Sequence, residues 1–507
     1  MKTSVYFLFY SFLCAAIFAQ QSPFDNSNQV PKDPIDEFQY IGYFYNSAVV
    51  NNIYPSQPLR GQLVGRLFSG NNPTLTGKTS MIFEQRLIPF FIYTPKLLDG
   101  KAILRASFEI DWVWGDANYS TGGNIGSAFN ADAVNIQTQN VELELIPAKG
   151  WAVNLGLQRV FDTPYNPYRV GVNTLTNTGY RLAFWGSDGV GISVRHDMDY
   201  ARYKLGYYQL FENADEQSDD VVLWELMYEK DMTPIWRQGI SFHYIADGGG
   251  GNSGTYGLNG SFSGLNGQFI FPIANYEANV FWIGTFGGYN PEFTLGRKMA
   301  SGFLMYNFGS VDDINANRSI DLSGLAANLR LGYKYGQTVD DNATADLLYV
   351  TGDKNGITDK KFKGIITGNS YGYPGAIFIS SGTYLLFPHG NVVNRYIAAV
   401  TDLSNIGYGL TGATVNVSKG VIPNKLNAKI GFGHAYSAEK PVGGGRLIGT
   451  EINARLSFIP RVFMNIELHA AYLRLGSFYE SAAVNGNQSK KPKSPWTAFI
   501  TYKWLMF

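Results

Sequence analysis

Disulfide bonds and many metal centres require cysteine, and this sequence has almost none. Of its 507 residues only Cys14 is a cysteine. It lies in the apolar stretch Val5–Phe18, which follows Lys2 and precedes Ala19, the order expected of a signal peptide over residues 1–19. The mature chain would therefore hold no thiol, which excludes disulfides and thiolate-bound metals.

Residue patterns of known catalytic sites are also missing. None of the five histidines has a second histidine at helical ligand spacing, and the sequence contains no HExxH, GxSxG or P-loop pattern. Lys and Arg together number 40, as do Asp and Glu, so no basic surface for nucleic acid is indicated. We therefore predict no enzyme, no catalytic or metal-ligating residues, no cofactor and no nucleic-acid partner.

One loop leaves ion binding open. Residues Asp353–Gly356, followed by Asp359, resemble a calcium loop but lack its middle acidic residue and its closing Glu. An Asn-Gly turn beside a charged loop explains the same residues equally well. The sequence does not decide between the two.

Long hydrophobic runs are absent after the N-terminal stretch. No later segment approaches the 18 or so apolar residues of a transmembrane helix. The chain is nevertheless 45% hydrophobic and 15% aromatic, with 57 glycines and only 16% charged residues. This composition suits membrane strands with aromatic girdles, although a soluble multi-domain β protein would share it. The positions of the aromatic residues and the length of the alternation distinguish the two.

The stretch Thr450–Gly476 shows that alternation most clearly. From Val462 to Tyr472 every second residue is apolar or aromatic, and Glu467 and His469 lie on the other face. A period of two is that of a β-strand. These eleven residues are close to the roughly 9–11 that a tilted strand needs to cross a bilayer. One apolar and one polar face predicts lipid outside and water inside.

An earlier strand repeats the pattern and adds a girdle. Leu104 and Phe108 share a face with Trp112 and Trp114, which lie at its far end as interfacial tryptophans would. The chain then alternates long polar loops with short turns such as 147–150. In outer-membrane barrels the turns are periplasmic and the loops extracellular.

We therefore predict an all-β fold, a closed antiparallel transmembrane β-barrel of about 18 strands (range about 16–20) with short periplasmic turns and long extracellular loops. Residues 59–507 are expected to form the barrel, with its first strands at Leu59–Phe68 and Met81–Tyr93. Residues 20–58 are expected to be an N-terminal periplasmic segment or a plug inside the barrel. The sequence does not choose between these two roles.

Residues 140–208 resemble the alginate-export family of outer-membrane porins. The residues that carry the resemblance are Val141–Leu145, Leu155–Arg159, Asn166–Arg169 and Thr178–Arg181. Tyr349–Asp353 also looks like a strand followed by Gly-Asp seen late in such porins. The resemblance implies a monomeric barrel of about 18 strands, with roughly 27 residues for each strand and its connection. It does not imply that alginate is the cargo.

The polar faces of the strands predict which charged residues line the lumen. The predicted bases are Arg105, Arg195, Arg202, Lys204, Arg330, Lys334, Lys429 and Arg455. The predicted acids are Glu109, Asp111, Glu142, Glu144, Glu225, Glu229, Glu451 and Glu467. Because the two sets are equally large, their fields should largely cancel beyond the roughly 8 Å screening length of physiological salt. The acids at 109–144 and the bases at 195–204 would still create a transverse field across the lumen.

These observations predict a porin or channel in the cell outer membrane for passive diffusion of small solutes with weak ion selectivity. The pore is expected to be open or narrowed by loops. Its expected partners are outer-membrane lipid, small solutes and the barrel-insertion machinery, which would read the terminal strand Trp496–Phe507. Alternatives are an alginate-export-like exporter of an anionic polysaccharide, an outer-membrane enzyme, or a secreted β-rich binding protein.

The strand phases also predict the effect of added charge. Leu104, Phe108, Ile466 and Leu468 should face lipid. Leu468→Arg should therefore reduce the yield of folded protein, because a charge in mid-bilayer costs about 2–4 kcal/mol. Glu467→Arg should be nearly silent, because Glu467 is predicted to face the lumen.

Overall fold

The structure is a computed structural model that describes most of the chain after residue 35. The described residues are 36–54, 63–67, 74–113, 134–161, 163–166, 168, 187–212, 219–260, 267–291, 293–371, 382–388, 395–487 and 491–507. Among them, no helix has the length and hydropathy needed to cross a bilayer. The predicted signal peptide, Trp114, and residues 169–186 of the resembling stretch lie outside the described residues.

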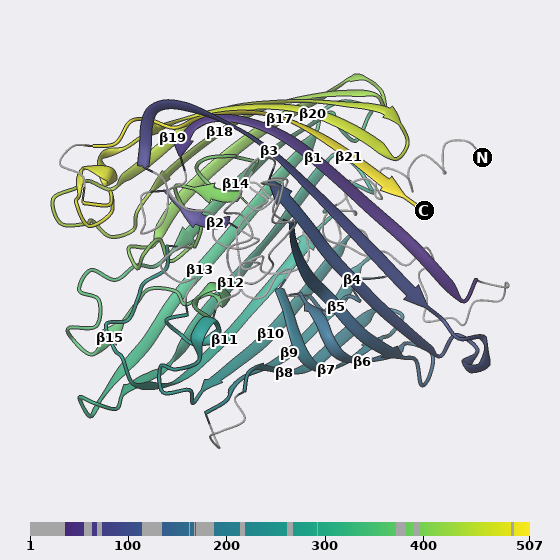
Figure 1. Cartoon of the computed structure of the whole chain (residues 1–507), viewed down its shortest axis with the longest axis horizontal. Coiled ribbons are helices and arrows are strands. Elements are labelled where there is room, and N and C mark those ends of the chain that lie inside the picture. The colour runs from purple at the N-terminus through teal and green to yellow at the C-terminus, as the bar shows by residue number, and fades with distance from the viewer. Residues whose placement is uncertain are drawn as a thin grey trace.

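Eighteen strands of the described chain form one closed antiparallel sheet, which can be followed around the barrel in Figure 1. They are β1 (Phe38–Tyr54), β3 (Thr74–Tyr93), β4 (Ala102–Val113), β5 (Val134–Leu145), β6 (Trp151–Val160), β7 (Ser187–Asp197), β8 (Ala201–Phe211), β9 (Val221–Thr233), β10 (Trp236–Asp247), β11 (Tyr276–Tyr289), β12 (Lys298–Asp313), β13 (Arg318–Lys334), β14 (Asn342–Val350), β17 (Leu410–Ile422), β18 (Leu426–Tyr436), β19 (Leu447–Arg461), β20 (Met464–Leu475) and β21 (Trp496–Met506). The predicted all-β, closed antiparallel barrel is confirmed.

Closure depends on β1. This strand pairs with β3 from Phe38↔Tyr93 onward and with β21 from Gly42↔Met506 to Asn51↔Thr497. The expected boundary at residue 58 is therefore wrong, because Phe38–Tyr54 belongs to the wall. The pattern concealed this strand because both of its faces carry aromatic residues. Tyr43 and Tyr45 are buried and belong to an apolar cluster with Leu505 of β21.

The connections at the two ends of the barrel differ in length, as expected. At one end, residues 234–235 join β9 to β10 and residues 462–463 join β19 to β20. At the other end, residues 351–409 separate β14 from β17. One connection at the long-loop end is short: residues 314–317 join β12 to β13, which together form a tall hairpin.

Within a strand, exposure alternates between the two faces. In β4, Leu104 is 45% exposed and Arg105 is 1% exposed, and in β20 Leu468 is 51% exposed and Glu467 is 3% exposed. Successive strand residues point to opposite sides of a sheet, so one side of the closed wall is apolar and the other is charged and buried. We take the buried side as the lumen face.

Three short strands of the described residues lie outside this antiparallel wall. β2 (Leu63–Arg66) pairs in parallel with β16 (Arg395–Ala398), and β15 (Lys361–Phe362) lies parallel to β13. The predicted wall strand Leu59–Phe68 is therefore wrong. Because β1 pairs directly with β3, no place remains between them for another strand. Four short 3-10 turns complete the described structure: η1 (Lys96–Leu98), η2 (Gly254–Tyr256), η3 (Gly368–Tyr371) and η4 (Ser477–Glu480).

The buried side of the wall is covered by loops over much of the barrel. The largest apolar cluster joins wall residues such as Met227 and Trp282 to loop residues such as Ile365, Leu386 and Leu403. Loop side chains therefore occupy part of the space that the barrel encloses. Of the two forms expected, open or narrowed by loops, the described loops favour the second.

A closed sheet should resist mild SDS, because every strand is paired on both sides and no edge is free. We expect the unboiled protein to migrate faster on a gel than the boiled protein. Equal mobility in the two lanes would contradict closure.

If the exposed apolar side of the wall faces lipid, the free-energy cost of an added charge should depend on its depth in the membrane. Leu468→Arg places a cation in the middle of β20 and should cost about 2–4 kcal/mol of folding free energy in lipid vesicles. Val462→Arg, at the turn before the same strand, should cost about 0–1 kcal/mol. The measurement is a urea titration of both variants and the unmodified chain. Equal losses would show that the exposed face is not the lipid face.

Candidate functional site

A band of charged side chains on β3–β9 covers the buried side of the wall, and we call it the inner ladder. Its members are acids on β4, β5 and β9 and bases on β3, β4, β7 and β8. They are Arg86, Arg105, Glu109, Asp111, Glu142, Glu144, Arg195, Arg202, Lys204, Glu225 and Glu229, all at most 9% exposed except Arg202, whose side chain is 11% exposed. Burying so many charges is tolerable only if each finds a partner of opposite sign or a hydrogen bond.

Arg105 neutralises two carboxylates at once. Its register partner on β5 is Glu142, and Glu144 lies two residues further along the same face. One guanidinium nitrogen, Nη1, is 3.2 Å from Glu142 Oε1 and 3.2 Å from Glu144 Oε2. Asn154 of β6 also donates to both carboxylates, at 3.1 and 3.3 Å. This group joins three adjacent strands.

Arg86 of β3 holds the next pair of acids. It makes a bidentate contact with Asp111, at 2.8 and 2.9 Å, and a close ion pair with Glu109. The Gln139 amide donates to the other oxygen of Glu109 at 2.8 Å. Sequence reasoning missed Arg86. The signal was present, because Arg86 alternates with apolar residues in the predicted strand Met81–Tyr93.

Two bases of β8 complete the inner ladder. Arg202 forms ion pairs with Glu229 and Asp231 of β9, the second at 2.7 Å. Lys204 pairs closely with Glu225, which also accepts a hydrogen bond from the Tyr208 hydroxyl at 2.8 Å. The acids and bases are therefore neighbours and are not separated across the lumen. The expected transverse field is wrong for this reason.

The chain after β6 turns back over the inner ladder. We call its described residues, 161, 163–166 and 168, the inner segment. The Phe161 carbonyl accepts a hydrogen bond from Lys204 Nζ at 3.2 Å, and the Tyr165 hydroxyl accepts one from Arg202 at 2.8 Å. Burial and the nearby charge of Glu229 raise the pKa of Tyr165, so its hydroxyl stays protonated.

The inner segment continues from β8 to β3–β5. Asn166 donates to Glu144 at 2.8 Å, and the Tyr168 hydroxyl accepts a hydrogen bond from Asn140 at 3.1 Å. The Tyr168 ring lies under the Arg105 guanidinium at 4.3 Å and stacks on Phe90. The inner segment thus contacts charged or polar side chains of strands β4, β5 and β8, and Phe90 of β3.

Gly156 marks the point where β6 leaves its neighbour. Pairing between β5 and β6 runs only from Leu145↔Val153 to Val141↔Leu157. Gly156 has φ +107°, and a Cβ there would lie 2.5 Å from the Val141 carbonyl oxygen. Only glycine takes this conformation readily, so the bend that precedes the inner segment has a local cause.

The remaining predicted residues lie on β13–β20, and the bases among them are less deeply buried than the inner ladder. The side chains of Arg330 and Arg455 are 20% and 26% exposed. Lys429 donates to the Gly382 carbonyl at 3.1 Å, and Lys334 is the last residue of β13. Arg330 is 3.8 Å from Asp346 Oδ2, at the outer limit of an ion pair. This part of the wall therefore carries more positive than negative charge.

Besides Asp346, the buried acids of that part of the wall are Glu467 and Glu451. Glu467 pairs with Lys503 at 2.7 Å and lies 3.7 Å from Arg455 and 3.4 Å from His469. Glu467→Arg would bring four basic groups together, so the expectation that this change is nearly silent does not hold. The Glu451 carboxylate accepts the backbone N–H groups of residues 384–386, at 2.6–2.8 Å. Glu451 thereby ties the loop between β14 and β17 to the wall.

Two loops carry acidic groups that a cation could approach. Asp353 accepts the backbone N–H groups of Asn355 and Lys363, at 2.7 and 3.0 Å. Asp359 accepts that of Lys361 at 3.2 Å, so both carboxylates hold the backbone of their own loop. In the loop between β8 and β9, Glu212, Asp219 and Asp220 have carboxylate oxygens within 4.8 Å of one another.

The fold and the inner ladder define a class, the transmembrane-type β-barrel with a charged interior. No protein-family model matches the chain, and no curated protein matches it in sequence. Similar solved structures include OccK5 (OpdH) of Pseudomonas aeruginosa, 11% identical over 92% of this chain and 98% of that chain, with a TM-score of 0.46. The outer membrane protein opdK of the same organism is 12% identical over 92% and 98%, with a TM-score of 0.48. OccAB4 of Acinetobacter baumannii is 11% identical over 95% and 100%, with a TM-score of 0.47.

These identities and TM-scores assign neither a family nor a cargo to this chain. The alginate-export family is not among the similar structures described above, and the resemblance to it is not shown. The strand pairing alone establishes a coarser class, the closed barrel of 18 strands.

Breaking a buried ion pair of the inner ladder should lower the free energy of unfolding much more than breaking an exposed ion pair. Arg105→Leu leaves Glu142 and Glu144 without their shared cation and should lower the free energy of unfolding by about 3–5 kcal/mol. Arg318→Leu breaks a pair with Asp313 at the β12–β13 hairpin, where the Arg318 side chain is 31% exposed. That change should cost less than about 1 kcal/mol. Urea titrations in lipid vesicles measure both, and equal costs would contradict the burial of the inner ladder.

Proposed function

We propose that this chain is an outer-membrane channel through which small solutes diffuse passively, with weak ion selectivity. One observation carries the proposal: the wall is closed and has an apolar outer side and a charged, hydrogen-bonded inner side. Such a wall separates lipid from a polar interior. A secreted β-rich protein would not expose a continuous apolar belt around its circumference.

Local neutralisation supports weak selectivity. A pore selects strongly for one ion sign when charges of one sign line a narrow passage. Along β3–β9 most charges have a partner of opposite sign within 4 Å, as Arg105 has in Glu142 and Glu144. Such a pair acts as a dipole, whose field is screened within about 8 Å at physiological salt. A solute would meet alternating donors and acceptors, which suits neutral and zwitterionic molecules.

Loops that fold inward support a small cargo. The inner segment lies on the inner ladder, and residues 384–386 are bound to Glu451 of β19. Trp282 of β11 donates its indole N–H to the Ile366 carbonyl at 2.7 Å. Strands from several parts of the wall therefore hold loop backbone inside the barrel. This narrowing favours small molecules over a folded protein or a bulky polymer.

A second candidate, export of an anionic polysaccharide, has one observation in its favour. The partly exposed bases of β13–β19, Arg330, Lys429 and Arg455, are not matched by equally exposed acids. A polyanion would need more than this local excess, because the rest of the inner ladder is neutralised. Small solutes therefore remain our first choice, and the chain is proposed to act as a monomer placed by the barrel-insertion machinery.

The test is the current through the purified full-length protein in a planar bilayer. We expect stepwise conductance and, under a tenfold KCl gradient, a reversal potential well below the roughly 59 mV of an ideally selective pore. The unmodified protein is compared with Arg330→Gln, which removes one partly exposed base. A strongly anion-selective potential that Arg330→Gln reduces would favour the polyanion exporter. Absence of conductance would contradict both candidates.

A further inference from the structure

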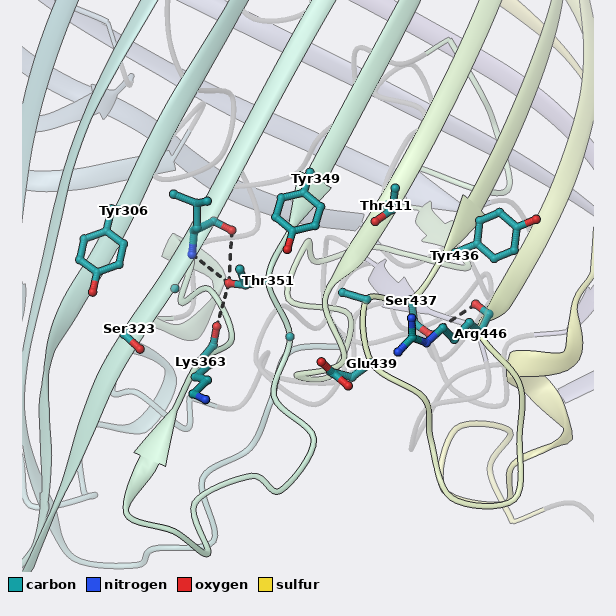
Figure 2. A pocket seen from close by; sticks show the side chains of 14 residues that line it. Tyr306, Ser323, Tyr349, Thr351, Lys363, Thr411, Tyr436, Ser437, Glu439 and Arg446 are labelled. Carbon is teal, nitrogen blue, oxygen red and sulfur yellow. Dashed lines mark hydrogen bonds between the residues drawn. The ribbon is translucent and has the colours of Figure 1, made fainter.

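A groove of about 760 Å³ opens on the outer side of the wall, at the end that carries the long loops. Figure 2 shows three tyrosines from neighbouring parts of the wall along it: Tyr306 of β12, Tyr349 of β14 and Tyr436 of β18. Each of them is between 41% and 46% exposed. Tyrosine is enriched where a membrane meets water, so the groove lies at the level of lipid headgroups.

The groove exists because β14 ends early. β13 pairs with β14 only from Ala326↔Val350 to Lys334↔Asn342, so residues 318–325 of the tall hairpin extend beyond it. We call the gap beyond the end of β14 the notch. Thr351 closes it, because its hydroxyl accepts the Leu325 N–H at 2.9 Å and donates to the Lys363 carbonyl at 2.7 Å. These bonds satisfy backbone groups that would be costly to leave unpaired beside lipid.

Apolar side chains continue from the groove toward the middle of the wall. Leu304, Leu347, Val415 and Phe432 lie on the same strands, further from the loops, and each is between 46% and 49% exposed. They belong to the surface that we assign to the hydrocarbon of the membrane. Acyl chains of a lipid in the groove would lie along these four side chains.

Charged and hydroxyl side chains form the loop side of the groove. Lys363, Glu439 and Arg446 lie there in Figure 2, together with Ser437. Among the described residues, no acid lies within ion-pair distance of Lys363 or Arg446, and both side chains are exposed. Two cations suit a phosphate group. The Glu439 carboxylate repels phosphate but accepts hydrogen bonds from sugar hydroxyls.

We propose that this groove binds the headgroup of a phosphorylated glycolipid of the outer leaflet. Lys363 and Arg446 lie on opposite sides of Glu439 in Figure 2, so each binds one phosphate of the headgroup. Glu439 and the hydroxyl groups bind its sugar, and the tyrosine rings pack against the sugar faces. Phosphatidylglycerol offers one phosphate and a glycerol, without a sugar ring on which the tyrosine rings could pack. The inference rests on the proposed location of the barrel in an outer membrane.

The experiment measures lipid bound to the purified full-length protein in mild detergent by native mass spectrometry. The probe is a bisphosphorylated, multiply acylated disaccharide lipid. The double variant Lys363→Gln, Arg446→Gln removes the two groove cations. The control, Lys361→Gln with Lys440→Gln, removes two exposed cations from the same loops that do not line the groove. We expect the dissociation constant to rise about tenfold or more in the first and less than about twofold in the second.

Three outcomes would overturn the inference: equal weakening in both double variants, equally tight binding of phosphatidylglycerol, or displacement of the lipid by excess inorganic phosphate. Unboiled samples of both variants must keep the fast gel mobility of the unmodified chain, because all four side chains are exposed and not part of the wall. Bilayer conductance separates the two proposals. Normal conductance without selective lipid binding refutes only the groove, and selective lipid binding without conductance refutes only the channel.

Discussion

Backbone hydrogen bonding in a medium without water is the constraint on which this structure depends. An unpaired N–H or C=O in hydrocarbon costs several kcal/mol, so a sheet beside lipid must have no edge. Here β1 satisfies this by pairing with β3 on one side and β21 on the other. Where a strand does end early, a side chain takes over, as the Thr351 hydroxyl does for the Leu325 N–H. The same constraint therefore accounts for the closed wall and for the way its notch is finished.

Closure also determines the electrostatics of the interior. Once the sheet is closed, every second residue points inward, and loops cover much of that side. Charges that would be cheap in open water then lose hydration, and each requires a partner. Arg105, placed between Glu142 and Glu144, shows the result: two buried carboxyl groups share one guanidinium. Burial by loops thus accounts for the local pairing on which the proposed weak ion selectivity rests.

Sequence could predict the parts of this structure whose two faces differ. Leu104 and Arg105 alternate in chemistry, so their strand and its inner residues were predictable. β1 was not, because Tyr43 and Tyr45 face inward yet are aromatic, which removes the contrast between its faces. The alternation of the sequence showed which face of its strand each charged residue would occupy. It did not show which residue would be its partner. The pairing of Arg86 with Asp111 depends on which strands are neighbours and in which register. The inner segment was unpredictable because its contacts are long-range.

The inner segment connects pairing with pore width. Its Tyr165 accepts a hydrogen bond from Arg202, and its Tyr168 lies under Arg105. Arg202 and Arg105, which neutralise acids of the inner ladder, thus also hold the inner segment by its tyrosine side chains. Removing either base would leave acids without that partner and would remove one of the contacts that hold the inner segment. In the proposed channel, ion selectivity and the width of the passage are therefore not independent, since both would depend on the same guanidinium groups.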